Sequence, residues 1–221
     1  MPLLGLFLMQ LNAQKPVNRE LEPFSRIVAG DKIIVRLVKS EKESARIQVQ
    51  GIDESAVKTV VKDDVLELSI YGEPFTKKKV MVTINYVNLS YISVSGGADV
   101  TTTSLFKSDN LVVDLKSGGM LYLDADVKSL TGKLVEGALL TAEGYAEHLD
   151  MTVSTAATLS AYDLECETVN IKATAGAKAK ISVESELNAE AASKGFISYK
   201  GNPSKLNRNA VSGGTIDPYK P

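Results

Sequence analysis

Few residues of the chain could carry out nucleophilic chemistry, because it holds one histidine and one cysteine. A Ser-His-Asp or Cys-His arrangement would have to use His148, for which a solvated position between repeats is the simpler interpretation. Cys166 stands between Glu165 and Glu167, and neighbouring carboxylates raise the pKa of a thiol, the wrong direction for a nucleophile. A single cysteine also excludes a disulfide within the chain and argues against a four-ligand Cys/His zinc site.

Acidic residues gather at two places along the chain. They are Asp124 and Asp126 at the first place, and Asp163, Glu165 and Glu167 at the second. Polysaccharide lyases and glycosidases built on β-helices use such carboxylates for calcium binding or for general acid/base catalysis. Those enzymes also bring basic and aromatic residues into a groove, whereas only Lys128 and Lys133 lie near the first cluster. A solvated face is the simpler interpretation, and we expect no catalytic residue, metal site or cofactor.

The composition is that of an ordinary globular chain. Of the 221 residues, 44% are hydrophobic and 24% are charged, which argues against disorder and allows one domain with a substantial core. The formal net charge is −2, from 25 basic and 27 acidic residues spread along the sequence. Because the basic residues form no stripe, and their longest run is the KKK at 77–79, we expect neither nucleic acid nor an anionic membrane as a partner.

The first residues indicate export. Residues 3–11 (LLGLFLMQL) form a short apolar run, which Asn12 and Ala13 follow. This pattern is typical of a secretory signal peptide over residues 1–13, and it is too short for a transmembrane helix. The alternative is a buried N-terminal strand. With the signal removed, we expect residues 14–221 to form one domain in the periplasm, on the outer-membrane surface or outside the cell, without membrane insertion.

Residues 24–88 favour strands and hairpins. Apolar residues alternate with polar ones there, as Ile33, Val35 and Leu37 do. A period of two with many β-branched residues is typical of half-buried strands. Turn residues separate the runs at 29–31 (AGD), 51–53 (GID), 63–64 (DD) and 72–74 (GEP).

A repeat of about twenty residues dominates residues 89–202. Its apolar anchor positions are Val94, Leu115, Leu134, Val153, Ala173 and Ala191. The positions two and four before the anchors and six after them are also mostly apolar. Four residues after the anchors every position is small: Ala98, Gly119, Ala138, Ala157, Ala177 and Gly195. Even offsets point to the same side of a strand, so these columns predict the interior of a stack of repeats, with the Ala/Gly column at a tight corner.

The columns predict an all-β fold: a right-handed, single-stranded parallel β-helix (β-solenoid) in which each repeat is one rung. The strand-rich portion 24–88 would precede the rungs at 89–202, and residues 203–221 would form a C-terminal cap. A leucine-rich repeat has a similar period but needs a recurring Asn and an LxxLxL pattern, which are not present. Residues 183–194 (VESELNAEAASK) are prone to form a helix, but the repeat places Leu187, Ala189 and Ala191 on inward columns and favours a strand.

Residues 91–100 (YISVSGGADV) resemble the signature of the head GIN domain family, whose name describes an auto-transporter adhesin. The order of the other features agrees: FSRI at 24–27, a strand at 80–86, the rungs, KGNP at 200–203 and SGGTI at 212–216. The resemblance covers nearly the whole chain after residue 13. It implies a secreted or surface-exposed bacterial protein with a right-handed β-helix fold, and it offers no catalytic or binding residues to carry over.

One outward column is a candidate binding face. Seven residues after the anchors stand Thr101, Tyr122, Thr141, Ser160, Lys180 and Ser198, most of which carry a hydroxyl group. A glycan or a peptide strand could lie along this ladder, with Tyr122 and Tyr162 as aromatic surface. The alternative is that Ser and Thr are ordinary solvent-facing strand residues.

Together these observations predict an exported binding or structural module of the cell envelope, an adhesin and not an enzyme, with an unidentified glycan or protein ligand. A carbohydrate-active β-helix enzyme is one alternative, and a self-associating envelope scaffold is another. Because Pro203, Pro218 and Pro221 discourage further strand addition at the C-terminal end, we expect a monomer or a side-by-side dimer.

Overall fold

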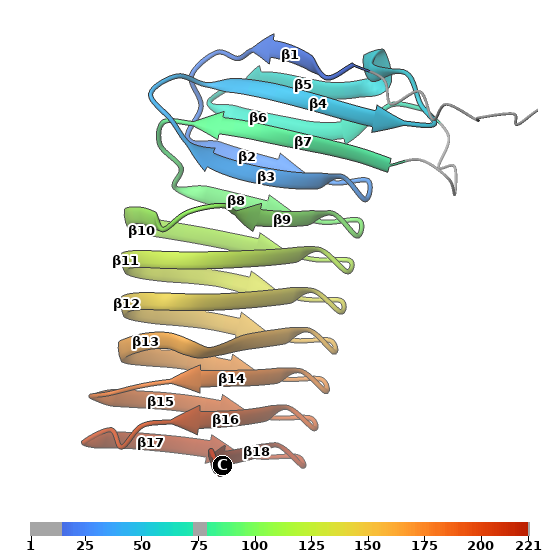
Figure 1. Cartoon of the computed structure of the whole chain (residues 1–221). Helices are drawn as coiled ribbons and strands as arrows, with labels where there is room; N and C mark the ends of the chain where they lie inside the picture. The colour runs from blue at the N-terminus through green and yellow to red at the C-terminus, as the bar shows by residue number, and fades with distance from the viewer. Residues whose placement is uncertain (1–14, 73–78, 221) are drawn as a thin grey trace, which may run out of the picture.

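The strands of the chain stack into one continuous rod of β-structure (Figure 1). The computed structural model describes residues 15–72 and 79–220, so the expected signal peptide over residues 1–13 lies outside the described residues. Within them, the one helical element is a short 3-10 turn, η1 (Glu54–Ala56). In this part of the chain no helix is long and apolar enough to cross a membrane. The all-β prediction is confirmed.

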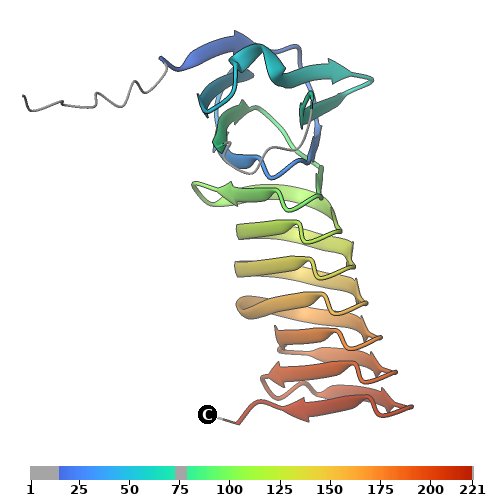
Figure 2. The same ribbon diagram turned by 90° about the vertical axis from the view of Figure 1, so that its right-hand side faces the viewer.

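The rungs of the solenoid run from β8 to β18. Their strands are β8 (Tyr91–Val94), β9 (Asp99–Thr102), β10 (Phe106–Leu115), β11 (Met120–Leu134), β12 (Leu139–Val153), β13 (Thr158–Ala173), β14 (Lys178–Ser182), β15 (Glu186–Ala191), β16 (Phe196–Lys200), β17 (Lys205–Ala210) and β18 (Thr215–Pro218). Strands β11 to β13 each wrap from one sheet, round a curved edge, to the other, and pair in parallel with their neighbours (Figure 2). Below β13 each rung divides: β14, β16 and β18 continue one sheet, and β15 and β17 continue the other.

The predicted register of the rungs is confirmed. Leu134 pairs with Leu115 on one side and with Val153 on the other, and all the anchors are fully buried. The column four residues before the anchors is an exception in the first rung, because Ser90 is exposed there and the neighbouring Leu89 is buried. That inward column therefore begins in the second rung. Residues 183–194 contain the strand β15, as the repeat predicts, because tertiary packing of the inward residues overrides local helix propensity.

A column of tight turns forms one corner of the rungs. In each turn two successive residues have positive φ, as Glu136 and Gly137 do, and a hydrogen bond of 3.2 Å from Ala138 N to Val135 O closes the turn. This is the geometry of a type I′ turn, whose twist matches that of the strands it joins. The turns also bond to one another, as Gly137 N does to Thr155 O at 3.0 Å. The residue after each turn belongs to the Ala/Gly column and is buried, so the tight corner is confirmed.

Residues 203–221, which the sequence assigns to a cap, include β17 and β18 and so extend the stack by one more rung. Ala210 pairs with Ala191, and Ile216 pairs with Ile197, so two inward columns continue into this segment. The described solenoid ends with this rung.

The N-terminal portion combines solenoid-like stacking with antiparallel strands. Its elements are β1 (Val17–Glu20), β2 (Arg26–Ala29), β3 (Ile34–Lys39), β4 (Ser44–Gln50), β5 (Val57–Lys62), β6 (Val65–Ile70) and β7 (Lys79–Tyr86). Strands β2 and β3 stack in parallel on β8 and β9, and β6 and β7 stack on β2 and β3. A β5–β6 hairpin and the antiparallel strands β4 and β1 complete this end (Figure 1). The predicted strand-rich beginning is confirmed, with β5–β6 as its one hairpin among the described residues. Most of the predicted turn at 72–74 lies outside them.

Candidate functional site

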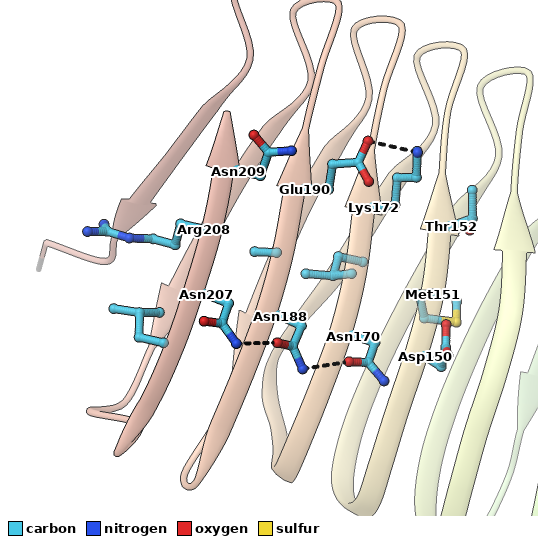
Figure 3. A pocket seen from close by; sticks show the side chains of 13 residues that line it. Asp150, Met151, Thr152, Asn170, Lys172, Asn188, Glu190, Asn207, Arg208 and Asn209 are labelled. Atoms are coloured by element: carbon cyan, nitrogen blue, oxygen red, sulfur yellow. Dashed lines mark hydrogen bonds and ion pairs between the residues drawn. The ribbon is translucent and has the colours of Figure 1, made fainter. Parts of the chain in front are cut away.

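An open groove crosses β12, β13, β15 and β17 on the outer face of one sheet (Figure 3). Its volume is about 570 Å³. One wall consists of Asp150, Asn170, Asn188 and Asn207, and the other consists of Thr152, Lys172, Glu190 and Asn209. Between the walls lie Met151, Ile171 and Ala189, whose side chains are buried, so the floor of the groove over β12, β13 and β15 is main chain. In β17 the same column holds Arg208, whose side chain is exposed.

Strand alternation explains the two walls. The anchors and the residues at even offsets face the core, so the residues one and three positions before each anchor face outward. Asn170 pairs in register with Asp150 and with Asn188, and Asn188 pairs with Asn207. The side chains of this wall therefore lie one above another, at the strand separation of about 4.8 Å.

Three asparagines form a hydrogen-bonded ladder along the first wall (Figure 3). Asn207 Nδ2 donates to Asn188 Oδ1 at 2.8 Å, and Asn188 Nδ2 donates to Asn170 Oδ1 at 3.0 Å. Each amide carries two N–H donors and an oxygen that accepts twice. Among residues 15–72 and 79–220, no hydrogen bond uses Asn170 Nδ2 or Asn207 Oδ1. The ladder thus offers donors at one end and an acceptor at the other.

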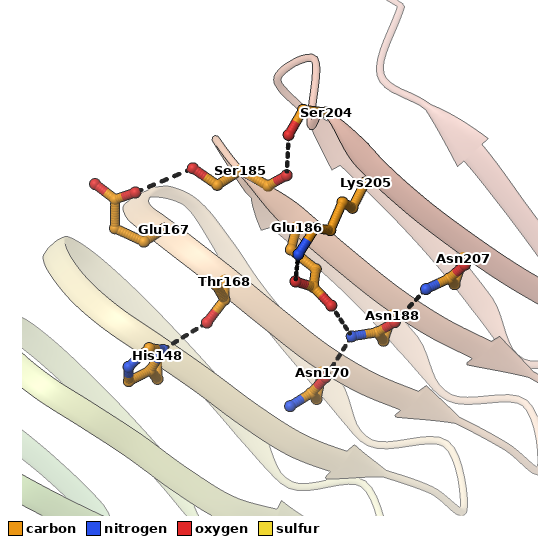
Figure 4. A network of polar contacts seen from close by, with 10 residues as sticks. All are labelled: His148, Glu167, Thr168, Asn170, Ser185, Glu186, Asn188, Ser204, Lys205 and Asn207. Carbon is orange, nitrogen blue, oxygen red and sulfur yellow. Dashed lines mark hydrogen bonds and ion pairs between the residues drawn. The ribbon is translucent and has the colours of Figure 1, made fainter.

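Charged groups fix the side chains around the ladder. Asn188 Nδ2 also donates to Glu186 Oε1 at 3.2 Å, and Lys205 Nζ lies 3.3 Å from Glu186 Oε2 (Figure 4). The hydrogen bonds from Asn188 and Lys205 hold the pKa of Glu186 below its ordinary value, so this carboxylate stays ionised and orients the Asn188 amide. On the second wall, Lys172 pairs with Glu190 at 2.8 Å.

His148 lies on the outward side of β12 and not in a loop between rungs (Figure 4). Its Nδ1 is 2.6 Å from Thr168 Oγ1, and its Nε2 is 3.3 Å from Glu147 Oε1. The side chains of His148 and Glu147 are 55% and 48% exposed, so the three groups lie on an open strand surface. A hydrolytic triad works beside preorganised oxyanion donors in a water-excluded site, which an open strand does not provide. The geometry therefore supports the interpretation of His148 as a solvated surface residue without a catalytic role.

The acidic residues considered for a carbohydrate-active site lie along the curved edge of the rungs, where several have partners. The partners are Lys107 at 2.8 Å for Asp126, Lys200 at 3.6 Å for Asp163, and Ser185 at 3.1 Å for Glu167. Lys128 pairs with Asp109 at 2.7 Å, and Lys133 stacks on Thr152 in the other sheet. Within the described ranges, no group of three His, Cys, Asp or Glu side chains could hold a metal ion. This arrangement fits a solvated, ion-paired edge.

Cys166 is buried on the inward side of β13, and burial raises the pKa of its thiol to about 12. Burial, and not the flanking carboxylates, is the cause.

We expect Ellman's reagent at pH 8 to label the folded protein more than about a hundredfold more slowly than the denatured chain, because the thiolate is the nucleophile. Since the thiol ionises near pH 8.5 only in the unfolded chain, stability should fall as the pH rises above about 8.5. Equal labelling rates in the two states would contradict the buried position.

The outward hydroxyl column is stacked as the sequence predicts. Tyr122 pairs with Thr101 and Thr141, and Lys180 pairs with Ser160 and Ser198. Exposure along the column is uneven, because Tyr122 is 41% exposed whereas Ser198 is 6% exposed. Tyr122 and Lys180 are therefore the exposed members of the column, and the other members are half-buried or buried.

The fold and the order of its elements agree with a known family. The family model described as "putative auto-transporter adhesin, head GIN domain" matches residues 23–203. The chain belongs to this family. No curated protein matches this head GIN domain.

Solved structures share the fold of this head GIN domain over nearly its whole length. A "putative adhesin" from Parabacteroides merdae ATCC 43184 has a TM-score of 0.76 and 22% identity, over 93% of this chain and 96% of that one. A "putative adhesin" from Bacteroides fragilis NCTC 9343 has a TM-score of 0.81 and 23% identity, over 94% and 98%. A "putative lipid binding protein" from Parabacteroides distasonis ATCC 8503 has a TM-score of 0.70 and 14% identity, over 93% and 97%. Because all three sequences are less than 25% identical to this chain, their similarity shows a shared fold.

The asparagine wall of the head GIN domain is the feature that sequence reasoning missed. Asn170 and Asn188 stand three residues before anchors, and Asn207 stands three before Ala210. One residue type at one offset in successive rungs is a signal that the sequence contains. Its last repetition falls in the segment assigned to a cap, which hid the pattern.

Proposed function

We propose that this head GIN domain is an exported, non-catalytic binding module of the cell envelope, an adhesin that holds a glycan in the asparagine groove. The groove of about 570 Å³ with its amide ladder is the observation that carries the proposal. The family description and the adhesin names of similar structures support a surface location and a binding role.

The chemistry of the groove suits a neutral glycan. A sugar hydroxyl both donates and accepts a hydrogen bond, and the ladder presents donors at Asn170 and an acceptor at Asn207. Lys172 and Glu190 of the opposite wall form an ion pair, and the other charged residues of the lining, Asp150 and Arg208, have opposite signs, so the lining carries no net charge. Because the groove is open and crosses several rungs, it suits a chain of sugars better than a small molecule, which proteins usually enclose.

A carbohydrate-active enzyme is the alternative from a different class. It would depend on the carboxylates of the curved edge, of which Asp126 and Asp163 are ion-paired with lysines. An enzyme would release new reducing or unsaturated ends from its glycan, whereas the proposed module binds the glycan unchanged. Incubation of a bound glycan with the protein, followed by an assay for new ends, separates the two functions.

Asn188→Ala is expected to weaken glycan binding about tenfold, because it removes the centre of the ladder and both of its inter-rung hydrogen bonds. The double variant Asn170→Ala/Asn188→Ala should lose retention altogether. Residues 14–221 would first be screened on an array of glycans and host matrix proteins. The affinity of each variant for the best ligand would then be measured by calorimetry.

The double variant Tyr122→Ala/Thr141→Ala is the matched control, because it truncates the outward hydroxyl column on the other sheet. It should bind as the unmodified protein does. If it abolishes retention while Asn188→Ala does not, the hydroxyl column is the binding face and the groove is not. No binding across the array would contradict the glycan proposal and favour an envelope scaffold whose partner is another protein of the same cell.

A further inference from the structure

Strand β13 contains one more residue than its neighbour β12, and that residue is a tyrosine. The two strands pair in register at Thr141 with Ser160, and next at Glu143 with Asp163, so two residues of β13 oppose one of β12. Ala161 keeps its inward place in the stack, because it is fully buried and pairs with Ile181 of β14. The additional residue is therefore Tyr162. Such β-bulges redirect a side chain and are found next to functional sites more often than elsewhere.

The bulge places the Tyr162 ring in a cluster of aromatic and cationic groups. Lys200 Nζ lies 4.9 Å from the ring centroid of Tyr162, and Lys180 Nζ lies 5.8 Å from it. The ring of Tyr219 meets Tyr162 edge to face, with centroids 5.0 Å apart, and Lys200 Nζ is 5.4 Å from the Tyr219 centroid. A hydrogen bond of 2.7 Å from Tyr219 N to Tyr199 O holds Tyr219 in place. Three strands and the segment after β18 thus meet at one point.

The two ammonium groups of this cluster differ in their electrostatic environment. Lys200 Nζ has the carboxylate of Asp163 at 3.6 Å. Within residues 15–72 and 79–220, no carboxylate oxygen lies within 4.0 Å of Lys180 Nζ. The Lys180 ammonium faces an aromatic ring and solvent, so it keeps its capacity to bind an anion.

We propose that Tyr162, Lys180, Lys200 and Tyr219 form a binding site for an anionic sugar, one that bears a carboxylate or a sulfate group. Lys180, assisted by Lys200, binds the anion, and the ring of Tyr219, which is 43% exposed, packs against the apolar face of the sugar ring. This site goes beyond the proposed function. It lies on the sheet of β14 and β16, across the curved edge from the asparagine groove, and it selects a charged ligand.

The test is a calorimetric titration of the full chain at low ionic strength with three disaccharides of similar size. They are maltose disulfate, which carries two sulfates and no carboxylate, digalacturonate, which carries two carboxylates and no sulfate, and maltose. The anionic sugars should bind with an affinity that falls as salt is added, and maltose should not bind at this site. A preference between the two anionic sugars identifies sulfate or carboxylate as the natural group. Lys180→Ala should weaken anionic sugar binding about tenfold, and Tyr219→Phe should retain binding while Tyr219→Ala loses it.

Lys178→Ala is the matched control, because it removes the same charge from the same face of β14 two residues away. Lys178 pairs with Thr158 and Phe196, outside the aromatic cluster. Asn188→Ala should also leave anionic sugar binding unchanged, so this site and the groove can fail separately. The proposal is overturned if neither anionic sugar binds, if maltose competes equally, or if Lys178→Ala and Lys180→Ala weaken binding equally. If Lys180→Ala and Tyr219→Ala lower only the unfolding temperature, the cluster merely fastens the C-terminal residues and the proposal is wrong.

Discussion

Replacement of Gly195 by alanine is expected to destabilise the folded protein by about 3 kcal/mol, at the upper end of the usual cost of overpacking a core. A Cβ atom at this position would lie 2.0 Å from the carbonyl oxygen and 2.5 Å from the carbonyl carbon of Ala173 in the preceding rung. Both are main-chain atoms of a stacked strand and cannot rotate away. The two rungs would have to move apart, which weakens the hydrogen bonds between them.

Thermal unfolding followed by circular dichroism measures this effect. For a chain of this length a loss of 3 kcal/mol lowers the midpoint by about 10 °C. Ala177→Gly is the matched control, because it lies in the same column one rung earlier and removes a methyl group where Gly195→Ala adds one. It should cost only about 1 kcal/mol, from lost burial and gained chain entropy. An unchanged midpoint for Gly195→Ala would mean that the rungs separate easily, against the tight corner described above.

The inward columns of the rungs were predictable because strand geometry leaves them little freedom. A residue such as Leu134 sits between Leu115 and Val153 of the adjacent rungs, so each inward position must be apolar in every rung. The corner after each turn admits no large side chain, which produces the Ala/Gly column. Because inward positions must be apolar, the apolar residues at even offsets from the anchors reveal the register of the rungs.

The features that sequence reasoning did not find depend on constraints other than burial. Outward positions tolerate any polar residue, so the alignment of Asn188 with Asn207 becomes visible only once the last rung is in register. At the bulge, the extra residue lengthens one repeat, but the pattern does not say that Tyr162 is the one displaced outward. Ile27 pairs with Ile92, which is far away in the chain. The alternation of apolar and polar residues within one strand predicts the strand but not which strand it pairs with.

The C-terminal end of the solenoid carries a charge at a position where earlier rungs are apolar. Two residues before the anchor, successive rungs carry Met151, Ile171 and Ala189, and the last rung carries Arg208 in the same stacked column. No described strand pairs with the outer edge of β17, and Leu206 beside it is 40% exposed. Figure 3 shows the Arg208 side chain extended beyond β17, away from the asparagine ladder. A charged residue at an inward position of an edge strand opposes the addition of another strand.

Arg208→Val is expected to promote end-to-end dimers, because covering this end would no longer bury an unpaired charge. Affinity between ends should rise by more than about a hundredfold, which light scattering coupled to size-exclusion chromatography detects over a series of concentrations. Asn209→Val is the matched control, since it adds the same apolar side chain to the same strand but on the outward wall of the groove. It should leave the oligomeric state unchanged. If Arg208→Val also leaves the oligomeric state unchanged at every concentration, the charge does not protect the end, and the prolines near it, such as Pro218, must do so by interrupting the main-chain donors of the last strand.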